Sequence, residues 1–590
     1  MGPLRISFLA LFFTIACGPS KRNYSDVDPE DTGSGGGKGD GGAASGGMAG
    51  ATSGSGASGS GASGSGGRPK DTESPVVVNV NPEADESDVS LDTVVSVLFS
   101  EEVKESTLNS ESFTVRNQIG GQVSAGSLQL EDGDLAVFTP EAPLQRGTMY
   151  TATVTTQVTD LAGNPLAAEE SWSFVTEAPS WGSAELIETD NAGAANYPQI
   201  AVDAKGNAIA VWQQSDGTRN NIWANRYVVG TGWGVATLIE KDDAGAARNA
   251  QVAVDAKGNA IAVWQQSDGT RDSIWANRYV VGTGWGIATL IEKDDAGAAE
   301  SPQVAVDSAG NAIAVWKQSD GSSSYILANR YDTEEGWGTA TLIDDVGGAR
   351  LPRVAVDSAG NALVVWDQWD GTLSNIRANR YETGTGWGTA SLIETEAGSA
   401  AFPRVAVDTG GNAIAVWQQS DGTRNRIRAN RYEMGTGWGT ATIIEADDDA
   451  TNVYPGSVAV DSMGNAVAVW RQADGAGNRT MANRFDVESG WGTATLLHEV
   501  GGSATDPQVA VDSAGNAVVV WQWQQEGIRT DIWAARYVAG SGWETPTLVE
   551  TDNAGGANLP QVAIDPAGNA MAVWSQSDGT RGNIWANLLR

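Results

Sequence analysis

The sequence is poor in two residue types on which many functional sites depend, with one cysteine, Cys17, and one histidine, His498, in 590 residues. A disulfide framework, a cysteine-based zinc site and a histidine metal cluster are therefore excluded. Basic residues are also few, since 36 Lys and Arg stand against 73 Asp and Glu and leave a formal charge of −37. A chain this acidic lacks the basic stripe that nucleic-acid binding requires. We expect no nucleic-acid partner, no cofactor and no bound metal.

No hydrophobic run reaches transmembrane length. Residues Ile6–Ile15 follow Arg5 and are too few to span a bilayer, but they have the length of a signal-peptide core. The run leads into Thr14-Ile15-Ala16-Cys17, which resembles the lipobox of bacterial lipoproteins, with Thr14 where that family usually has Leu. The resemblance implies a signal peptide at residues 1–16, a lipid on Cys17 and, because Gly18 follows, sorting to the outer membrane. The alternative is an ordinary signal peptide with an incidental cysteine.

A glycine-rich segment follows the predicted cleavage site. Gly33–Gly67 has 17 glycines in 35 residues, and Ser and Ala make up most of the rest. Such a composition cannot bury a core, so residues 17–74 are predicted to be a flexible tether, with a span of roughly 30–35 Å for the glycine-rich part. The tether would hold the rest of the chain away from the membrane, on the cell surface or facing the periplasm, with the lipid as the only membrane contact.

Residues 75–178 have the pattern of a small β-sandwich. Alternating runs such as Val94–Phe99 and Tyr150–Val154 predict strands, and about 100 residues of short strands suit an Ig-like fold. The segment resembles the bacterial Ig-like domain of S-layer and other surface proteins, through the motifs Phe99–Val103, Asp160–Leu166 and Trp172–Phe174. That resemblance implies a spacer or adhesion module without catalysis.

From Trp181 to Arg590 the sequence repeats. Trp-Gly or Trp-Glu steps mark the copies at spacings of 50 to 53 residues, beginning at Trp181, Trp233, Trp285, Trp337, Trp387, Trp438, Trp491 and Trp543. In the first complete copy the pattern predicts four strands, at residues 198–203, 207–214, 221–228 and 232–240, joined by tight turns. Four antiparallel strands in about 50 residues are typical of a propeller blade.

The repeat begins and ends out of phase. It opens with a lone fourth strand, Trp181–Glu188, and ends with a third strand, Asn583–Leu589. Pairing these two strands would complete an eighth blade and remove both free edges, whereas an open solenoid gains nothing from the offset. The sequence therefore predicts an all-β chain in which the Ig-like sandwich precedes an eight-bladed propeller at residues 181–590, closed by its N-terminal strand.

Four residue types recur through the copies. The strand-two tryptophans, such as Trp212, lie in runs that are apolar on both faces, which predicts inter-blade core. The tryptophans that open strand four are predicted to pack against a neighbouring blade or hairpin, with a ring of sugar-stacking platforms as the alternative. The Asp of Val-Ala-Val-Asp, such as Asp203, is predicted to accept backbone N–H groups across its turn rather than to ligate calcium. The strand-three Arg, such as Arg226, is predicted to pair with a carboxylate, in a ring that Leu588 interrupts.

The connections from strand four to one and from strand two to three are predicted to leave on one face, which we call the loop face. Four of the two-to-three turns contain Asp-Gly-Thr-Arg, and a fifth pairs Glu with Arg. Asp and Arg on one turn can hydrogen-bond polyols or acidic sugars, and repetition favours multivalent binding, although each turn alone is also typical of a solvated hairpin. The candidate ligand-binding residues are Asp216, Arg219, Asp268, Arg271, Asp421, Arg424, Glu526, Arg529, Asp578 and Arg581.

No catalytic residue is predicted. The turn Ser215–Thr218 resembles the Asp-box of sialidase-like propellers only loosely, because Ile222 and Trp223 follow too late, so no sialidase residue carries over. A glycosidase needs two carboxylates facing one bond, and the pattern places no two carboxylates in that way. The side chains that break the repeat contain no recognisable nucleophile with its base; they are Lys317, Asp367, Trp369, Arg471, Trp523 and Glu526.

These features lead to one hypothesis and two alternatives. We expect a lipid-anchored surface protein that binds carbohydrate or another extracellular polymer through repeated propeller loops. One alternative is a polysaccharide-active hydrolase or lyase on a sialidase-like propeller, and the other is a scaffold that binds another envelope protein. Near-identical blades argue against an enzyme, because a single catalytic site would select for asymmetry.

Overall fold

The computed structural model describes residues 71–117, 123–189, 193–240, 245–292, 297–344, 346–445, 452–473, 477–498, 502–525, 528–551 and 555–590. The predicted signal peptide, Cys17 and the glycine-rich segment lie outside these ranges. The described chain is built of β-strands and one short 3-10 helix, η1 (Glu105–Thr107). Within these ranges, no helix has the length and apolar character needed to cross a membrane.

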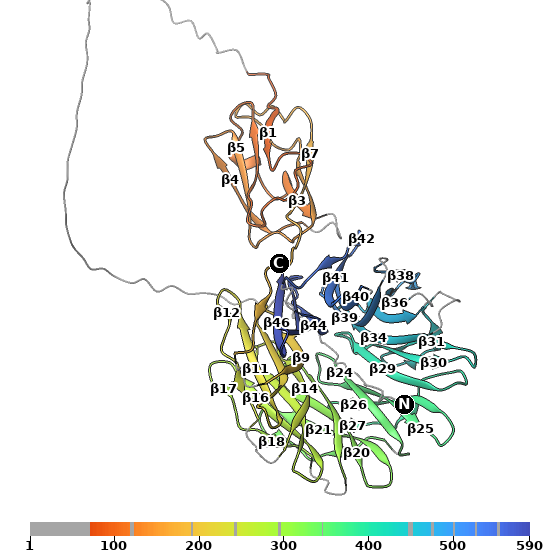
Figure 1. Ribbon diagram of the computed structural model, residues 1–590. Coiled ribbons are helices and arrows are strands. Elements are labelled where there is room, and N and C mark those ends of the chain that lie inside the picture. Colours follow the sequence, from red (N-terminus) through yellow and green to blue (C-terminus); the bar gives the residue numbers. More distant parts are fainter. Residues whose placement is uncertain are drawn as a thin grey trace, which may run out of the picture.

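The first folded unit is a sandwich of two antiparallel sheets (Figure 1). One sheet has the strand order β1-β2-β5-β4 and the other β3-β6-β7. Burial alternates along β2, and the rings of Phe113, Phe138 and Trp172 pack together in the core. The strands are β1 (Val77–Asn81), β2 (Val95–Phe99), β3 (Phe113–Asn117), β4 (Gly126–Glu131), β5 (Leu135–Pro140), β6 (Met149–Val154) and β7 (Glu170–Val175).

The repeat region forms consecutive antiparallel sheets, which we number from the N-terminus. In sheet 1 the first three strands agree with the prediction to within three residues and are β9 (Ala195–Val202), β10 (Ala208–Ser215) and β11 (Asn220–Val228). The single fourth strand predicted at residues 232–240 is wrong, because it is divided into β12 (Gly232–Trp233) and β13 (Thr237–Leu238). Both pieces pair with β11, and one extra residue between them forms a bulge.

Six further sheets repeat this arrangement in the described chain. Sheet 2 consists of β14 (Ala247–Val254), β15 (Ala260–Ser267), β16 (Asp272–Val280), β17 (Gly284–Trp285) and β18 (Thr289–Leu290). Sheet 3 consists of β19 (Ala299–Val306), β20 (Ala312–Ser319), β21 (Ser324–Asp332), β22 (Gly336–Trp337) and β23 (Thr341–Leu342). Sheet 4 consists of β24 (Ala349–Val356), β25 (Ala362–Trp369), β26 (Ser374–Glu382), β27 (Gly386–Trp387) and β28 (Ser391–Leu392). Sheet 5 consists of β29 (Ala400–Val407), β30 (Ala413–Ser420), β31 (Asn425–Glu433), β32 (Gly437–Trp438) and β33 (Thr442–Ile443). Sheet 6 consists of β34 (Asn452–Val460), β35 (Ala466–Ala473), β36 (Asn478–Asp486), β37 (Gly490–Trp491) and β38 (Thr495–Leu496). Sheet 7 consists of β39 (Ser503–Val511), β40 (Ala517–Gln524), β41 (Thr530–Val538), β42 (Gly542–Trp543) and β43 (Thr547–Leu548).

Sheet 8 joins the two ends of the repeat region. Its strands β44 (Ala557–Ile564), β45 (Ala570–Ser577) and β46 (Gly582–Leu589) are followed in the sheet by β8 (Glu185–Leu186), which pairs Leu186 with Trp585. The first strands of successive sheets contact one another, and β44 also contacts β9, as the blue and yellow strands of Figure 1 show. The repeated sheets are thus consistent with a propeller.

The core lies between the sheets. All eight strand-two tryptophans are fully buried, which confirms their predicted place: Trp212, Trp264, Trp316, Trp366, Trp417, Trp470, Trp521 and Trp574. Each cluster of buried side chains combines two neighbouring sheets, as where Ile209 and Val211 of sheet 1 pack with Trp264 of sheet 2. Alanines on strand two let the neighbouring sheet approach closely.

The Val-Ala-Val-Asp residues close their own turns, as predicted. In sheet 1 the Asp203 carboxylate accepts hydrogen bonds from the backbone N–H groups of Lys205 and Asn207 and from the Asn207 side chain. Gly206 of the same turn has a φ of +81°, and a Cβ there would lie 2.8 Å from an Asp565 carboxylate oxygen of sheet 8. The turn of sheet 1 therefore lies against the turn of sheet 8.

The strand-three arginines have two partners, of which the sequence indicated one. Four of them pair with a carboxylate two residues later, as predicted: Arg330, Arg380, Arg431 and Arg484. Three of these four, and also Arg226 and Arg278, lie over the aromatic ring of the next sheet; Arg226, for example, lies 5.5 Å from the Tyr279 ring centroid. In sheet 8 Leu588 occupies the arginine position, as predicted, and Arg590, two residues later, lies over Tyr227 and donates a hydrogen bond to its hydroxyl.

Candidate binding surface

The Asp-Gly-Thr-Arg turns lie on the loop face, next to the connections from strand four to strand one. In sheet 1, for example, the Ser215 N–H at the end of β10 donates to the carbonyl of Ala194, 3.0 Å away. Equivalent bonds join Ser267 to Ala246 and Ser577 to Gly556. Both kinds of connection therefore belong to one surface.

The Asp of each turn shapes the turn itself. One Asp216 oxygen accepts the Thr218 hydroxyl at 2.6 Å and the N–H groups of Thr218 and Arg219, and the other accepts the Asn221 amide. The Thr218 hydroxyl and these backbone groups lower the pKa of Asp216 well below its ordinary value, because they donate to the charged form. Asp268, Asp421 and Asp578 make the same bonds to the residues two and three positions later.

The arginines of these turns lie along the turn and are partly exposed. The Arg219 Nε is 3.3 Å from the Asn221 side-chain oxygen and 3.7 Å from the nearer Asp216 oxygen. Arg271, Arg424 and Arg581 lie 3.7 to 4.0 Å from their own Asp. Arg529 differs, since it pairs with Asp531 at 2.7 Å and with the buried Glu550 at 3.2 Å. Glu526 lies outside the described residues.

The tryptophans that open strand four pack edge-to-face against strand three of their own sheet. The Trp233 ring lies 5.6 Å from that of Tyr227, and six other copies repeat this contact with Tyr or Phe at 5.3 to 5.6 Å. Their rings are half-buried at the outer edge of each sheet. This is the packing role predicted for them.

The copies differ most where strand one begins, again on the loop face. Here, in seven of the eight sheets, a bulge puts one residue into the left-handed region, with φ between 50° and 58°. The side chain at this position changes from copy to copy: Tyr197, Asn249, Ser301, Leu351, Phe402, Asp506 and Leu559. In sheet 6 the bulge lies between Pro455 and Ser457, and Tyr454 pairs with Arg471, as Asn196 pairs with Gln213 in sheet 1. We call these seven side chains the variable ring; the repeat-breaking residues predicted from the sequence do not include them, although comparison of the copies in the sequence shows the variation.

Several repeat-breaking residues predicted from the sequence neighbour the variable ring. Lys317 pairs with Glu300 at 2.9 Å, and Asp367 pairs with Arg350 at 3.2 Å. Burial raises the pKa of Asp367 to about 6, against the lowering effect of Arg350. In sheet 6 the Arg471 guanidinium lies 4.3 Å from the centre of the Tyr454 ring, which also contacts Phe402 at 5.9 Å. The Trp369 side chain, at the end of β25, is 47% exposed.

This surface combines aromatic faces with charged groups that are paired. Such a mixture can stack on sugar rings and hydrogen-bond their hydroxyls. Trp369 and Tyr197 offer the most accessible aromatic rings on the loop face, at 47% and 38% exposed. The arrangement suits binding of a polar, ring-containing ligand.

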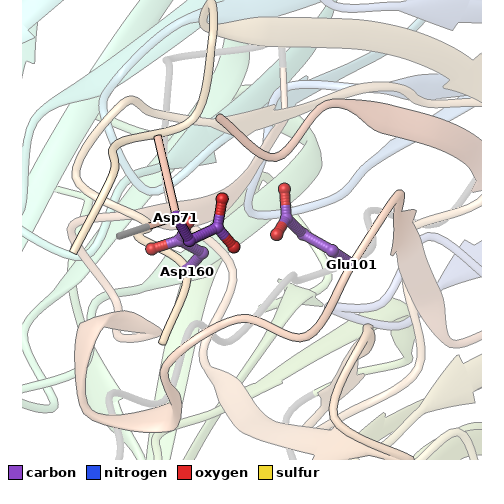
Figure 2. Close-up of side chains that lie close together, drawn as sticks. All are labelled: Asp71, Glu101 and Asp160. Atoms are coloured by element: carbon purple, nitrogen blue, oxygen red, sulfur yellow. The ribbon is translucent and has the colours of Figure 1, made fainter. Parts of the chain in front are cut away.

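The sandwich carries a separate group of acidic side chains. Carboxylate oxygens of Asp71, Glu101 and Asp160 lie within 4.8 Å of one another, and Figure 2 shows Glu101 facing the other two. Asp160 is buried and accepts hydrogen bonds from the backbone and side chain of Asn164, so it shapes the loop that follows it. Desolvation and the charges of Asp71 and Asp160 raise the pKa of Glu101.

Comparison with known proteins identifies one part of the chain. Residues 71–176 match the family model of the bacterial Ig-like domain. The sandwich is a bacterial Ig-like domain. The match confirms the resemblance to a bacterial Ig-like domain seen in the sequence. No curated protein matches the chain.

Solved structures resemble the chain at low identity. A protein of unknown function from Dyadobacter fermentans DSM 18053 is 12% identical with a TM-score of 0.37, covering 70% of this chain and 99% of its own. A PL25 ulvan lyase is 10% identical with a TM-score of 0.41, covering 57% and 90%. The NanB sialidase of Streptococcus pneumoniae is 11% identical with a TM-score of 0.33, covering 74% and 86%.

Proposed function

We propose that this protein is a lipid-anchored cell-surface protein whose repeat region is a closed, eight-bladed propeller that binds an extracellular carbohydrate polymer on its loop face. The bacterial Ig-like domain is the spacer between tether and propeller. The single observation that carries the binding proposal is the variable ring. Side chains that differ between otherwise similar copies collect on the same face as the Asp-Gly-Thr-Arg turns and the exposed Trp369.

Three contacts support closure of the ring. Strand β8 pairs with β46, β44 contacts β9, and the turn at Gly206 lies against Asp565. The last contact repeats the spacing found between consecutive sheets, since a Cβ at Gly258 would lie 2.6 Å from an Asp203 oxygen. The turns of sheets 8 and 1 therefore contact each other in the same way as the turns of sheets 1 and 2.

The hydrogen bonds within the turns also change which side chains are expected to contact the polymer. The turn carboxylates are occupied by their own turns, so we assign contact with the polymer to the turn arginines and to the aromatic side chains of the loop face. Each such contact is weak, and repetition around the face makes the binding multivalent. A polymer gains from this arrangement, whereas a small ligand meets one contact at a time.

A glycan and polysaccharide array with residues 68–590 tests the proposal. We expect binding without product, and we expect Trp369→Ala to weaken binding by up to about 10-fold because a stacking aromatic contributes about 0.5–1.5 kcal/mol. The matched control is Met463→Ala, which removes a 75% exposed apolar side chain from the turn Asp461–Gly464, on the opposite face. Equal binding by the two variants would contradict the loop-face site. Cleavage products of a bound polysaccharide would favour the hydrolase or lyase alternative. A lack of binding to every glycan on the array would favour the protein scaffold.

The anchor has its own test. We expect Cys17→Ser to move the protein from the membrane fraction to the soluble fraction, because the thiol is the only group in the sequence suited to lipidation. Metabolic labelling with a fatty acid and cell fractionation measure the change. Ser34→Ala in the same tether is the control and should leave both labelling and fractionation unchanged. Retention of the Cys17→Ser variant in the membrane would rule out the lipoprotein assignment.

A further inference from the structure

A second position on strand one differs between the copies and lies deeper than the variable ring. Five copies have glutamine there, and all five side chains are buried: Gln199, Gln251, Gln303, Gln508 and Gln561. Sheets 4 and 5 instead have Arg353 and Arg404, which are only 1% and 5% exposed. Sheet 6 has the small Ser457, which follows Gly456. Two neighbouring sheets thus replace a neutral side chain by a cation in the interior.

The two arginines are near each other. They occupy equivalent positions on β24 and β29, and these first strands are in contact. Burial lowers the pKa of Arg353, and the positive charge of Arg404 lowers it further. Burial likewise lowers the pKa of Arg404, to about 10. Arginine side chains are protonated at neutral pH in proteins, so both groups are treated as cations.

Neither arginine has a carboxylate partner within the described part of the chain. Arg353 donates one hydrogen bond, to the carbonyl of Pro352, and its buried Nε has no partner. Arg404 donates to the carbonyls of Gly456 and Pro403. Asp367 is the carboxylate whose charge acts on Arg353, but it is already held by Arg350. Arg350 and Arg353 therefore share one carboxylate, so the buried positive charges are incompletely compensated.

An incompletely compensated pair of buried cations is costly. Removing one ion from water costs several kcal/mol even after relaxation, and like charges add repulsion. The small Gly456 and Ser457 explain why a long side chain fits at Arg404, since its Nε reaches the Gly456 carbonyl at 2.7 Å. They do not explain the charge, because neutral glutamine occupies this position in the five other copies. A bound anion would supply the missing charge.

We propose that Arg353 and Arg404 together bind one oxyanion between the inner strands of sheets 4, 5 and 6. The planar guanidinium group presents paired N–H donors that match a carboxylate, sulfate or phosphate group, and the free Nε of Arg353 supplies one of these donors. The oxyanion comes either as a free small anion or as a charged group carried by an acidic polysaccharide. This site does not depend on the carbohydrate binding proposed for the loop face.

The experiment compares the full Cys17→Ser chain with the same chain carrying Arg353→Gln and Arg404→Gln. The two glutamines are the residue that five other copies use, so the double variant should fold. Sodium sulfate at low millimolar concentration, matched in ionic strength with sodium chloride, is titrated while the melting temperature is recorded. We expect the parent chain to gain about 3 °C at a sulfate concentration 100-fold above its Kd, and the double variant to gain nothing.

Two further measurements complete the test. Anions released on unfolding are measured by ion chromatography, so that an anion already bound after purification is counted; we expect one equivalent from the parent chain and none from the variant. A titration with oligogalacturonate distinguishes a free small anion from a charged group on a polysaccharide. A larger increase in melting temperature with oligogalacturonate than with sulfate would assign the site to a polymer-borne carboxylate. Equal sulfate responses of the two chains, with no anion released from either, would overturn the proposal. Arg353→Lys should bind more weakly than the parent, because it retains charge without the paired donors.

Discussion

Removal of residues 181–188 is expected to lower the free energy of unfolding of the repeat region by about 5 kcal/mol. The segment contains the buried Ile187, whose N–H donates to the carbonyl of Ile584, and Gly182, whose N–H donates to that of Leu588. Burial of one isoleucine contributes about 1.5–3 kcal/mol, and each hydrogen bond adds about 1 kcal/mol. The deletion would also expose β46 as a free edge, which favours aggregation.

The measurement is thermal and urea unfolding of the chain from residue 18 onward. Deletion of residues 51–58 is the matched control, because it removes the same number of residues from the predicted tether and should leave the melting temperature unchanged. A chain without residues 181–188 that melts like the control would contradict the closed propeller. A chain that melts earlier and also forms larger oligomers would fit an opened ring.

Substitutions of His498 and Trp523 are expected to have strongly coupled effects on the free energy of unfolding. In several sheets the strand-two tryptophan donates to a glutamine two residues later, and that glutamine donates to a buried acid at the end of strand four, as Trp264, Gln266 and Glu240 do. In sheet 7 histidine replaces the acid and tryptophan replaces the glutamine. The His498 ring lies 5.1 Å from Trp523 and 4.9 Å from Trp533, while the Nε1 of Trp521 has no partner.

Each single reversion should therefore destabilise the protein. His498→Glu places a carboxylate against aromatic rings without its amide donor, and Trp523→Gln removes a side chain that is only 7% exposed. We expect each to cost about 2–4 kcal/mol. The double substitution restores the hydrogen-bond network of the other sheets, so it should be more stable than either single variant, with a coupling energy of about 1–3 kcal/mol. Additive losses in denaturant unfolding would show that the two positions act independently.

The fold was largely predictable because its signals are local. Alternation along strand two and Gly-containing turns such as Asp203–Asn207 define each hairpin within a few residues, and the repeat then multiplies that information. The phase of the repeat predicted that the strand near Trp181 would join the last sheet, and β8 does pair with β46. The fourth strand was mispredicted as one piece because its bulge depends on the register against strand three, which a linear pattern does not show.

The candidate site was less predictable because it depends on contacts between sheets. The sequence indicated Asp216 and its copies as ligand-binding residues, whereas their carboxylate oxygens accept hydrogen bonds from their own turns. The sequence alone determined the residue types, the repeat and the likeness of residues 71–176 to a bacterial Ig-like domain. Only the tertiary structure showed the variable ring on one face and the buried, incompletely compensated charges of Arg353 and Arg404. Burial and charge balance are set by neighbours about 50 residues away in the sequence, and only folding brings those neighbours together.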